Sequence, residues 1–262
     1  MSVEVHSSSV VSSKAQLEDG VKIGPFCYIS DDVKIGAGTE LVAFVSVHDH
    51  VSIGKNCKIC EHTAIGGEPQ DHGFKGEVSY VRIGSNNLIR ENVTINRATG
   101  EGNATTVGND CFIMEGVHFA HNVEIGDSVT IANKVVLSGF SKVGSHTVFG
   151  GMAGVHQFVR IGEYCMIGGL YRVSKDVPHY TLASGEPLRL TGLNKVGLRR
   201  GGFSPETIKK IYSFYRYLYD KDARFTDSLQ DAVKSKAQYI PEVQKIIEFY
   251  ENTQRGVTFW GI

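Results

Sequence analysis

Residues 107–173 decide the fold, and they read VGNDCFIMEGVHFAHNVEIGDSVTIANKVVLSGFSKVGSHTVFGGMAGVHQFVRIGEYCMIGGLYRV. An aliphatic or aromatic residue recurs at every sixth position: Val107, Ile113, Phe119, Ile125, Ile131, Leu137, Val143, Phe149, Val155, Ile161, Ile167 and Val173. A small or β-branched residue lies four positions after most of these. This period fits neither an α-helix nor an isolated strand, so the chain must coil as a repeat. The sequence predicts a parallel β-helix in which three hexads form one turn and successive turns stack at the strand spacing.

The hexads extend back to the N-terminus and are interrupted twice. Apolar residues hold the sixth positions from Val5 onward, and the exceptions are Asp71, Glu77 and Glu101. These exceptions predict two loops, near residues 67–81 and 98–106. Loops inserted into a solenoid are usually functional, because the coils themselves are occupied by packing.

After Pro178 the hexads stop, which predicts a β-helix domain over 1–178 and a linker with a helical domain over 179–262. A helix should begin at Pro205 behind the N-cap Ser204. It should bury the apolar stripe Ile208, Ile211, Tyr212, Tyr215 and Leu218. Further helices are expected near Thr226 and from Pro241, the last one capped by Gly256. The tail 257–262 should pack against the rest of the chain.

Composition excludes several classes of protein. The net charge is −1 and the hydrophobic fraction 41%, which argues against a nucleic-acid-binding protein. Neither a signal peptide nor a stretch of 18 apolar residues is present, so we expect no membrane span. The cysteines are odd in number, and four of them occupy the small position of a hexad. That placement favours buried thiols in a reducing cytoplasm over disulfides or a zinc site.

One column of stacked residues suggests chemistry. At an 18-residue spacing, His121 lies below Gly139, and Gly139 lies below Gln157. A neutral imidazole can take a proton from a hydroxyl, and a bare glycine N–H can stabilise an oxyanion. These are turn positions, where we expect side chains to face solvent or a neighbouring subunit. Three histidines grouped beside two loops make an active site a better interpretation than a polar surface.

Several motifs resemble one family. These are GGEPQD, IGSNNLIRENVTINR, GVHFAHNVEIGD, SGFSKVG, GGMAGVHQFVRIG, IGGLYRVSKDVPHY and LNKVGLRRGGF. They closely resemble the UDP-N-acetylglucosamine O-acyltransferases of lipid A biosynthesis, over nearly the whole chain. The resemblance implies a left-handed β-helix, an exception to the usual handedness of parallel crossovers, and a cytoplasmic homotrimer. It also implies transfer of a 3-hydroxyacyl chain from the phosphopantetheine arm of acyl carrier protein to the 3-position of UDP-N-acetylglucosamine, with no metal or other cofactor.

The resemblance also implies roles for individual residues. His121 matches the general base and Gly139 the donor to the thioester oxygen, while Asn122 follows the base and can orient its ring. Gly169 matches the position that limits acyl-chain length. Contacts to the sugar nucleotide or the acyl-carrier arm are implied at Gln70, Asp71, His118, His156, Gln157, Asn194 and Arg200.

The chain departs from the family pattern beside the sugar. Asn122 replaces the usual aspartate, Phe140 a histidine and Gly73 a lysine, with Lys75 a possible substitute in the same loop. Because a cationic neighbour would oppose an amine acceptor, these losses leave N-acylation of a 3-amino UDP-sugar as an alternative.

Two other classes and one surface complete the expectations. A γ-type carbonic anhydrase would need three histidines on zinc with an H-x4-H pair, whereas this chain has H-x2-H at His118 and His121. A non-catalytic hexapeptide scaffold would leave the two loops unexplained.

A basic cluster could steer an acidic acyl carrier protein, or it could be a solvated helical face. It comprises Lys195, Arg199, Arg200, Lys209, Lys210 and Arg216.

Overall fold

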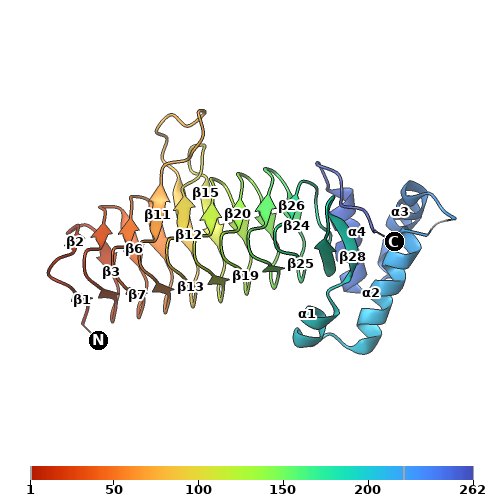
Figure 1. Cartoon of the computed structure of the whole chain (residues 1–262), viewed down its shortest axis with the longest axis horizontal. Helices are drawn as coiled ribbons and strands as arrows, with labels where there is room; N and C mark the ends of the chain where they lie inside the picture. The colour runs from red at the N-terminus through yellow and green to blue at the C-terminus, as the bar shows by residue number, and fades with distance from the viewer. Residues whose placement is uncertain (1, 221, 262) are drawn as a thin grey trace.

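The computed structural model describes residues 2–220 and 222–261. Figure 1 shows a long three-sided prism of short strands, with the N-terminus at one end and the helices packed at the other. Each turn contributes one strand to each of three parallel sheets. A pair of loops projects from the middle of the prism, above β11 and β12.

The sheets contain eleven, nine and eight strands. The 11-stranded sheet contains β1 (Glu4–Val5), β4 (Lys22–Ile23), β7 (Glu40–Leu41), β10 (Lys58–Ile59), β13 (Leu88–Ile89), β16 (Phe112–Ile113), β19 (Thr130–Ile131), β22 (Val148–Phe149), β25 (Met166–Ile167), β27 (Thr181–Ser184) and β28 (Arg189–Leu193). The 9-stranded sheet contains β2 (Val10–Val11), β5 (Tyr28–Ile29), β8 (Ser46–Val47), β11 (Ala64–Gly67), β14 (Thr94–Asn96), β17 (His118–Phe119), β20 (Val136–Leu137), β23 (Gly154–Val155) and β26 (Arg172–Val173). The 8-stranded sheet contains β3 (Gln16–Leu17), β6 (Val33–Ile35), β9 (Val51–Ile53), β12 (Tyr80–Ile83), β15 (Ala104–Val107), β18 (Glu124–Ile125), β21 (Lys142–Val143) and β24 (Arg160–Ile161).

The register follows the hexads. His118 pairs with Val136, and Phe119 with Leu137, which is the predicted 18-residue offset. The offset grows where the loops are inserted, between β11 and β12 and between β14 and β15. Residues at the sixth positions point inward, where Phe119, Ile131 and Leu137 are fully buried. At the open N-terminal end no coil covers the first hexad, and Val5 stays 46% exposed.

The five cysteines are free and buried, as four of them were predicted to be. Burial raises the pKa of the Cys165 thiol to about 12, so it stays protonated and unreactive at neutral pH. The thiols act as small apolar groups in the prism.

The C-terminal segment contains more structure than the sequence predicted. Residues expected to form a linker instead form the antiparallel pair β27 and β28, and β27 extends the 11-stranded sheet by pairing with β25. A short helix that was not predicted, α1 (Lys195–Arg200), follows Asn194. Because the sheet continues beyond residue 178, the domain boundary placed there stays a prediction.

The remaining helices are α2 (Pro205–Leu218), α3 (Phe225–Lys234), the 3-10 turn η1 (Lys236–Gln238) and α4 (Pro241–Glu251). Ser204 caps α2 by accepting the Thr207 N–H, as predicted. Two details of the prediction are wrong. Tyr212 is 37% exposed, and its ring lies under the Lys195 ammonium. The cap of α4 is Asn252 and not Gly256, because the helix ends at Glu251.

The tail packs back onto the capped end of the prism. Val257 bridges to Asp176 and Trp260 to Leu190. The Trp260 ring lies 5.4 Å from the ring of Tyr215. The tail therefore joins the last coil to α2. Among the described residues, no helix combines the length and apolarity needed to cross a bilayer.

Candidate active site

His121 follows β17 at the corner between the 9-stranded and 8-stranded sheets. The register places it beneath Gly139 and Gln157, since His118 pairs with Val136 and Val136 with Gly154. Its side chain is only 3% exposed. The side chain does not face solvent, because Asp71 and Thr99 of the two loops lie over the corner, and the alternative that it faces a neighbouring subunit stays a prediction.

Gly139 lies against the imidazole ring of His121. A Cβ at this position would come within 2.5 Å of Cε1 and 2.6 Å of Nε2 of His121. Any side chain here would therefore displace the ring. The Gly139 N–H donates to no group that the structure describes, while its carbonyl accepts from Phe158. This corner thus holds an imidazole beside an amide donor that is free for a ligand.

Asn122 fixes which nitrogen of His121 carries the proton. Its Oδ1 accepts from the Thr99 N–H at 2.9 Å, so this atom is the oxygen of the amide and can only accept. The same Oδ1 lies 2.9 Å from His121 Nδ1. Nδ1 must therefore donate, and in the neutral ring the lone pair is on Nε2.

Asp71 approaches that lone pair from the loop between β11 and β12. Its Oδ2 is 3.6 Å from His121 Nε2, and its side chain is 36% exposed. The other oxygen accepts from the Gly73 N–H at 2.7 Å, which holds the carboxylate in a tight turn. A hydroxyl that enters between Asp71 and His121 would meet an acceptor on each side.

Phe140 forms the apolar side of the corner. Its ring meets the His121 ring edge-on with 5.2 Å between centroids, and it stacks on Phe158 at 4.9 Å. Because Phe158 is 48% exposed, the two stacked rings form an apolar surface beside the imidazole. Phe140 departs from the family pattern in the sequence, and in the structure its ring packs against the imidazole of His121.

Two further histidines lie near this corner, His118 on the same coil as His121 and His156 two coils on. His118 projects from β17, and its Nδ1 is 2.7 Å from Thr94 Oγ1. Burial lowers the pKa of His118, which favours its neutral form. His156 is exposed, with Nδ1 3.3 Å from the Gln157 carbonyl. The substrate-binding roles of His118, His156 and Gln157 stay predictions.

Two loop residues face solvent. Gln70 and Lys75 are both exposed, and Lys75 Nζ donates to the His72 carbonyl at 3.1 Å. In this arrangement the ammonium does not face the imidazole. The substrate-binding roles of Gln70 and Lys75 stay predictions.

Three predicted site residues lie at other corners of the prism. Asn194 caps α1 by accepting the Gly197 N–H and donates to the Tyr164 carbonyl at 2.9 Å. Arg200 is exposed at the end of α1. Gly169 lies between β25 and β26, where a Cβ would come 2.9 Å from the Gly151 carbonyl oxygen. A single chain therefore does not bring these residues to His121.

Comparison with known proteins identifies the family. Residues 176–258 match the model described as "Udp N-acetylglucosamine O-acyltransferase; Domain 2". Residues 14–48 and 104–139 match "Bacterial transferase hexapeptide (six repeats)". The acyl-[acyl-carrier-protein]–UDP-N-acetylglucosamine O-acyltransferase of Thermodesulfovibrio yellowstonii is 45% identical over 97% of this chain and 98% of its own. The chain belongs to this acyltransferase family.

Solved structures of the family agree in fold. The UDP-N-acetylglucosamine acyltransferase of Bacteroides fragilis superposes with a TM-score of 0.92 at 38% identity, covering 97% of this chain and 99% of that one. That of Francisella novicida gives 0.93 at 36% identity, covering 97% and 94%. These matches confirm the predicted left-handed parallel β-helix with C-terminal helices.

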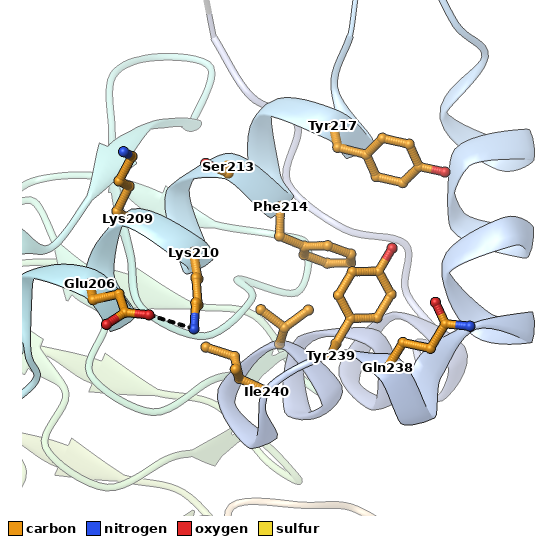
Figure 2. A pocket seen from close by; sticks show the side chains of 10 residues that line it. Glu206, Lys209, Lys210, Ser213, Phe214, Tyr217, Gln238, Tyr239 and Ile240 are labelled. Atoms are coloured by element: carbon orange, nitrogen blue, oxygen red, sulfur yellow. Dashed lines mark ion pairs between the residues drawn. The ribbon is translucent and has the colours of Figure 1, made fainter.

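The acyltransferase also has a hollow away from His121. A pocket of about 580 Å³ lies between α2 and the η1–α4 segment. Figure 2 shows Phe214, Tyr217 and Tyr239 along it, with Lys210 turned to Glu206 at one end. That ion pair measures 2.8 Å. The pocket contains none of the residues expected to do chemistry.

One group of side chains in the described ranges has a spacing suited to a metal ion: Cys60, Glu61 and Glu91. Glu91 is already engaged by the Arg90 guanidinium at 2.8 Å, and burial raises the pKa of Cys60. Both features disfavour metal ligation. The group lies at a different corner of the prism from His121.

Proposed function

We propose that this chain transfers a 3-hydroxyacyl group from acyl carrier protein to the 3-hydroxyl of UDP-N-acetylglucosamine, the first step of lipid A biosynthesis, with His121 as the general base. The single observation that carries the proposal is the pairing of a free Nε2 lone pair with the unoccupied Gly139 N–H at one corner. Family membership supplies the substrate classes.

The reaction can be written with these groups alone. Nε2 of His121 removes the hydroxyl proton as the sugar oxygen attacks the thioester carbonyl and a C–O bond forms. The Gly139 N–H donates to the resulting oxyanion. Collapse of the intermediate breaks the C–S bond, and the imidazolium returns its proton to the phosphopantetheine thiolate. Asp71 is placed to accept from a sugar hydroxyl. No step calls on a metal or further cofactor.

A homotrimer explains why Asn194, Arg200 and Gly169 lie away from His121. The outward side of the 8-stranded sheet carries charges such as Lys34, Glu124 and Lys142. The outward residues of the 11-stranded sheet beyond β10 are mostly apolar: Leu88, Phe112, Thr130, Val148, Met166 and Leu182. Such a stripe favours burial against another subunit. We propose that this face, with the corners beside it, meets the His121 corner of the neighbouring copy.

Acyl carrier protein should dock on the basic cluster defined above. Lys210 pairs with Glu206, whereas the other five cations form no ion pair with any described carboxylate and are exposed. An unpaired basic surface attracts an acidic carrier at long range. The KM for acyl carrier protein should accordingly rise with ionic strength. The free thiols fit a cytoplasmic location.

A second candidate acceptor is a 3-amino UDP-sugar. Asp71 is the charged group beside His121 Nε2, Lys75 is turned away, and Phe140 supplies an apolar edge. A carboxylate at this position would attract an ammonium acceptor. This would change the bond formed from an ester to an amide.

The test is product analysis with purified protein, a 3-hydroxyacyl carrier protein and equal amounts of UDP-N-acetylglucosamine and its 3-amino analogue. We expect an acyl ester of the hydroxyl sugar, detected by mass spectrometry and cleaved by mild alkali. An alkali-stable amide as the dominant product would favour the amino sugar. Absence of any acylated sugar with either acceptor would leave the scaffold alternative and overturn the proposal.

A further inference from the structure

The amide of Asn122 is matched to the main chain of Thr99. The Thr99 N–H donates to Asn122 Oδ1 at 2.9 Å, and Asn122 Nδ2 donates back to the Thr99 carbonyl at 3.1 Å. The Thr99 hydroxyl adds a donor to Oδ1 at 3.0 Å. A carboxylate has no N–H, so aspartate could accept from Thr99 but would set its second oxygen against the Thr99 carbonyl.

This match decides more than the orientation of Asn122. Because Thr99 holds Oδ1 in place, the oxygen faces His121 Nδ1 at 2.9 Å and accepts its proton. Were the amide turned over, Nδ2 would face Nδ1 and the proton would have to move to Nε2. The imidazole would then have no lone pair on the side of Asp71.

Thr99 is itself held by its own loop and by the neighbouring one. The Asn103 amide donates to its carbonyl at 3.0 Å. The next N–H, of Gly100, donates to Glu77 Oε1 at 2.8 Å. This bond is the largest cause of the lowered pKa of Glu77, followed by a bond from the Lys75 N–H. Since the segment 68–79 also carries Asp71, the two loops act as one unit around the ring.

We infer that Thr99 is a positioning residue for the general base: its main chain selects an amide at position 122 and thereby keeps the His121 proton on Nδ1. The inference rests on the proposed function, in which Nε2 is the base. In isolation a carboxylate partner would stabilise an imidazolium better than an amide does. Here the Thr99 carbonyl makes aspartate the poorer choice.

The experiment compares Asn122→Asp with Asn103→Asp. Both changes replace an amide that donates to the Thr99 carbonyl, but only Asn122 touches His121. Hydrogen exchange of the Thr99 and Gly100 amides, kcat, KM and the pH profile of kcat/KM would be measured in the full-length protein. Thr99→Ala, which keeps both main-chain bonds, serves as the conservative variant.

For Asn122→Asp we expect faster exchange at Thr99, kcat lowered by about tenfold or more, and a displaced acid limb of the pH profile. Asn103→Asp should loosen the loop without moving the acid limb, and Thr99→Ala should lower kcat by less than about threefold. Wild-type exchange and wild-type or higher kcat in Asn122→Asp would overturn the inference. If exchange rises while His121→Ala remains active, the Thr99 contact stands and the proposed function fails.

Discussion

His121 is buried and His179 is half-buried, and their ring nitrogens have opposite roles. His121 lies at the corner between the 9-stranded and 8-stranded sheets, where its Nδ1 donates to Asn122 Oδ1. His179 lies where the last coil meets the helices, and its Nδ1 accepts from the Glu163 N–H at 2.9 Å. The neutral ring of His179 must therefore carry its proton on Nε2. The difference teaches that burial alone does not decide which ring nitrogen has a lone pair; the hydrogen bond at Nδ1 does.

The surroundings of the two rings differ in the same way. The His121 ring meets a carboxylate and a free amide N–H. The His179 ring packs edge-on against Phe249, 5.1 Å between centroids, and its carbonyl accepts from the Tyr215 hydroxyl. The His121 ring lies beside polar groups that could contact a ligand, whereas His179 joins the β-helix to α2 and α4.

Removing each imidazole gives the sharpest contrast. His121→Ala should lower turnover by about 10²–10⁴, the usual loss when a general base is removed. His179→Asn, whose Oδ1 can replace Nδ1 as an acceptor, should keep turnover near the wild-type value. Steady-state rates with acyl carrier protein and UDP-N-acetylglucosamine check both. A His121→Ala enzyme within about tenfold of wild type would break the comparison.

Lowering the pH should destabilise the protein through His179, which lies where the last coil meets the helices. Desolvation is the main cause that lowers the pKa of His179 to about 4, from about 6.5 in the unfolded chain. The unfolded chain therefore binds a proton that the folded chain excludes. The free energy of unfolding should fall as the pH falls from about 6.5 to about 4, by at most about 3 kcal/mol from this group. Denaturant unfolding of wild type and His179→Asn across this range should show a flatter dependence in the variant. An equal pH dependence of the free energy of unfolding in the two proteins would show that His179 does not cause the loss of stability.

The sequence predicts the prism and the column well, because both follow from one period. Positions such as Phe119 and Leu137 are buried, and their register places Gly139 on His121. The contacts of the two loops with the His121 corner could not be predicted from the sequence. Thr99 and Asp71 lie in loops where the six-residue period is interrupted, so their positions relative to Asn122 and His121 do not follow from it. The pair β27 and β28 was missed because its residues do not continue the six-residue period. The helix α1 was missed because six residues with a glycine give too weak a helical signal.

A methyl group at Gly139 should disturb only the reactive corner. Gly139→Ala would place Cβ 2.5 Å from His121 Cε1, so the ring must shift away from its productive position. We expect kcat to fall by about tenfold or more with little change in thermal stability. Gly154→Ala is the matched control, because its added methyl group meets nothing within 4 Å. Equal activity of the two variants would show that the ring contact is unimportant.

The smallest expected effect is a change of preference rather than of rate. Gly169→Met should favour shorter acyl donors, because the new side chain would occupy the position expected to hold the end of the acyl chain. Each CH₂ of the acyl chain that remains buried contributes about 0.8 kcal/mol. Competition among donors of different length checks the ratio. Since a Cβ at 169 comes 2.9 Å from the Gly151 carbonyl oxygen, the assembly of the variant is verified first. An unchanged preference for acyl-chain length would show that Gly169 does not limit the length of the acyl chain.

The central claim concerns the position of two protons, and a neutron diffraction map of perdeuterated crystals at about pH 8, where a histidine of ordinary pKa is neutral, tests it most directly. The account predicts deuterium on Nδ1 of His121 with Nε2 bare, and deuterium on Nε2 of His179 with Nδ1 bare. Deuterium on Nε2 of His121, with the ring facing Asp71 as a donor, would contradict the assignment of His121 as the base.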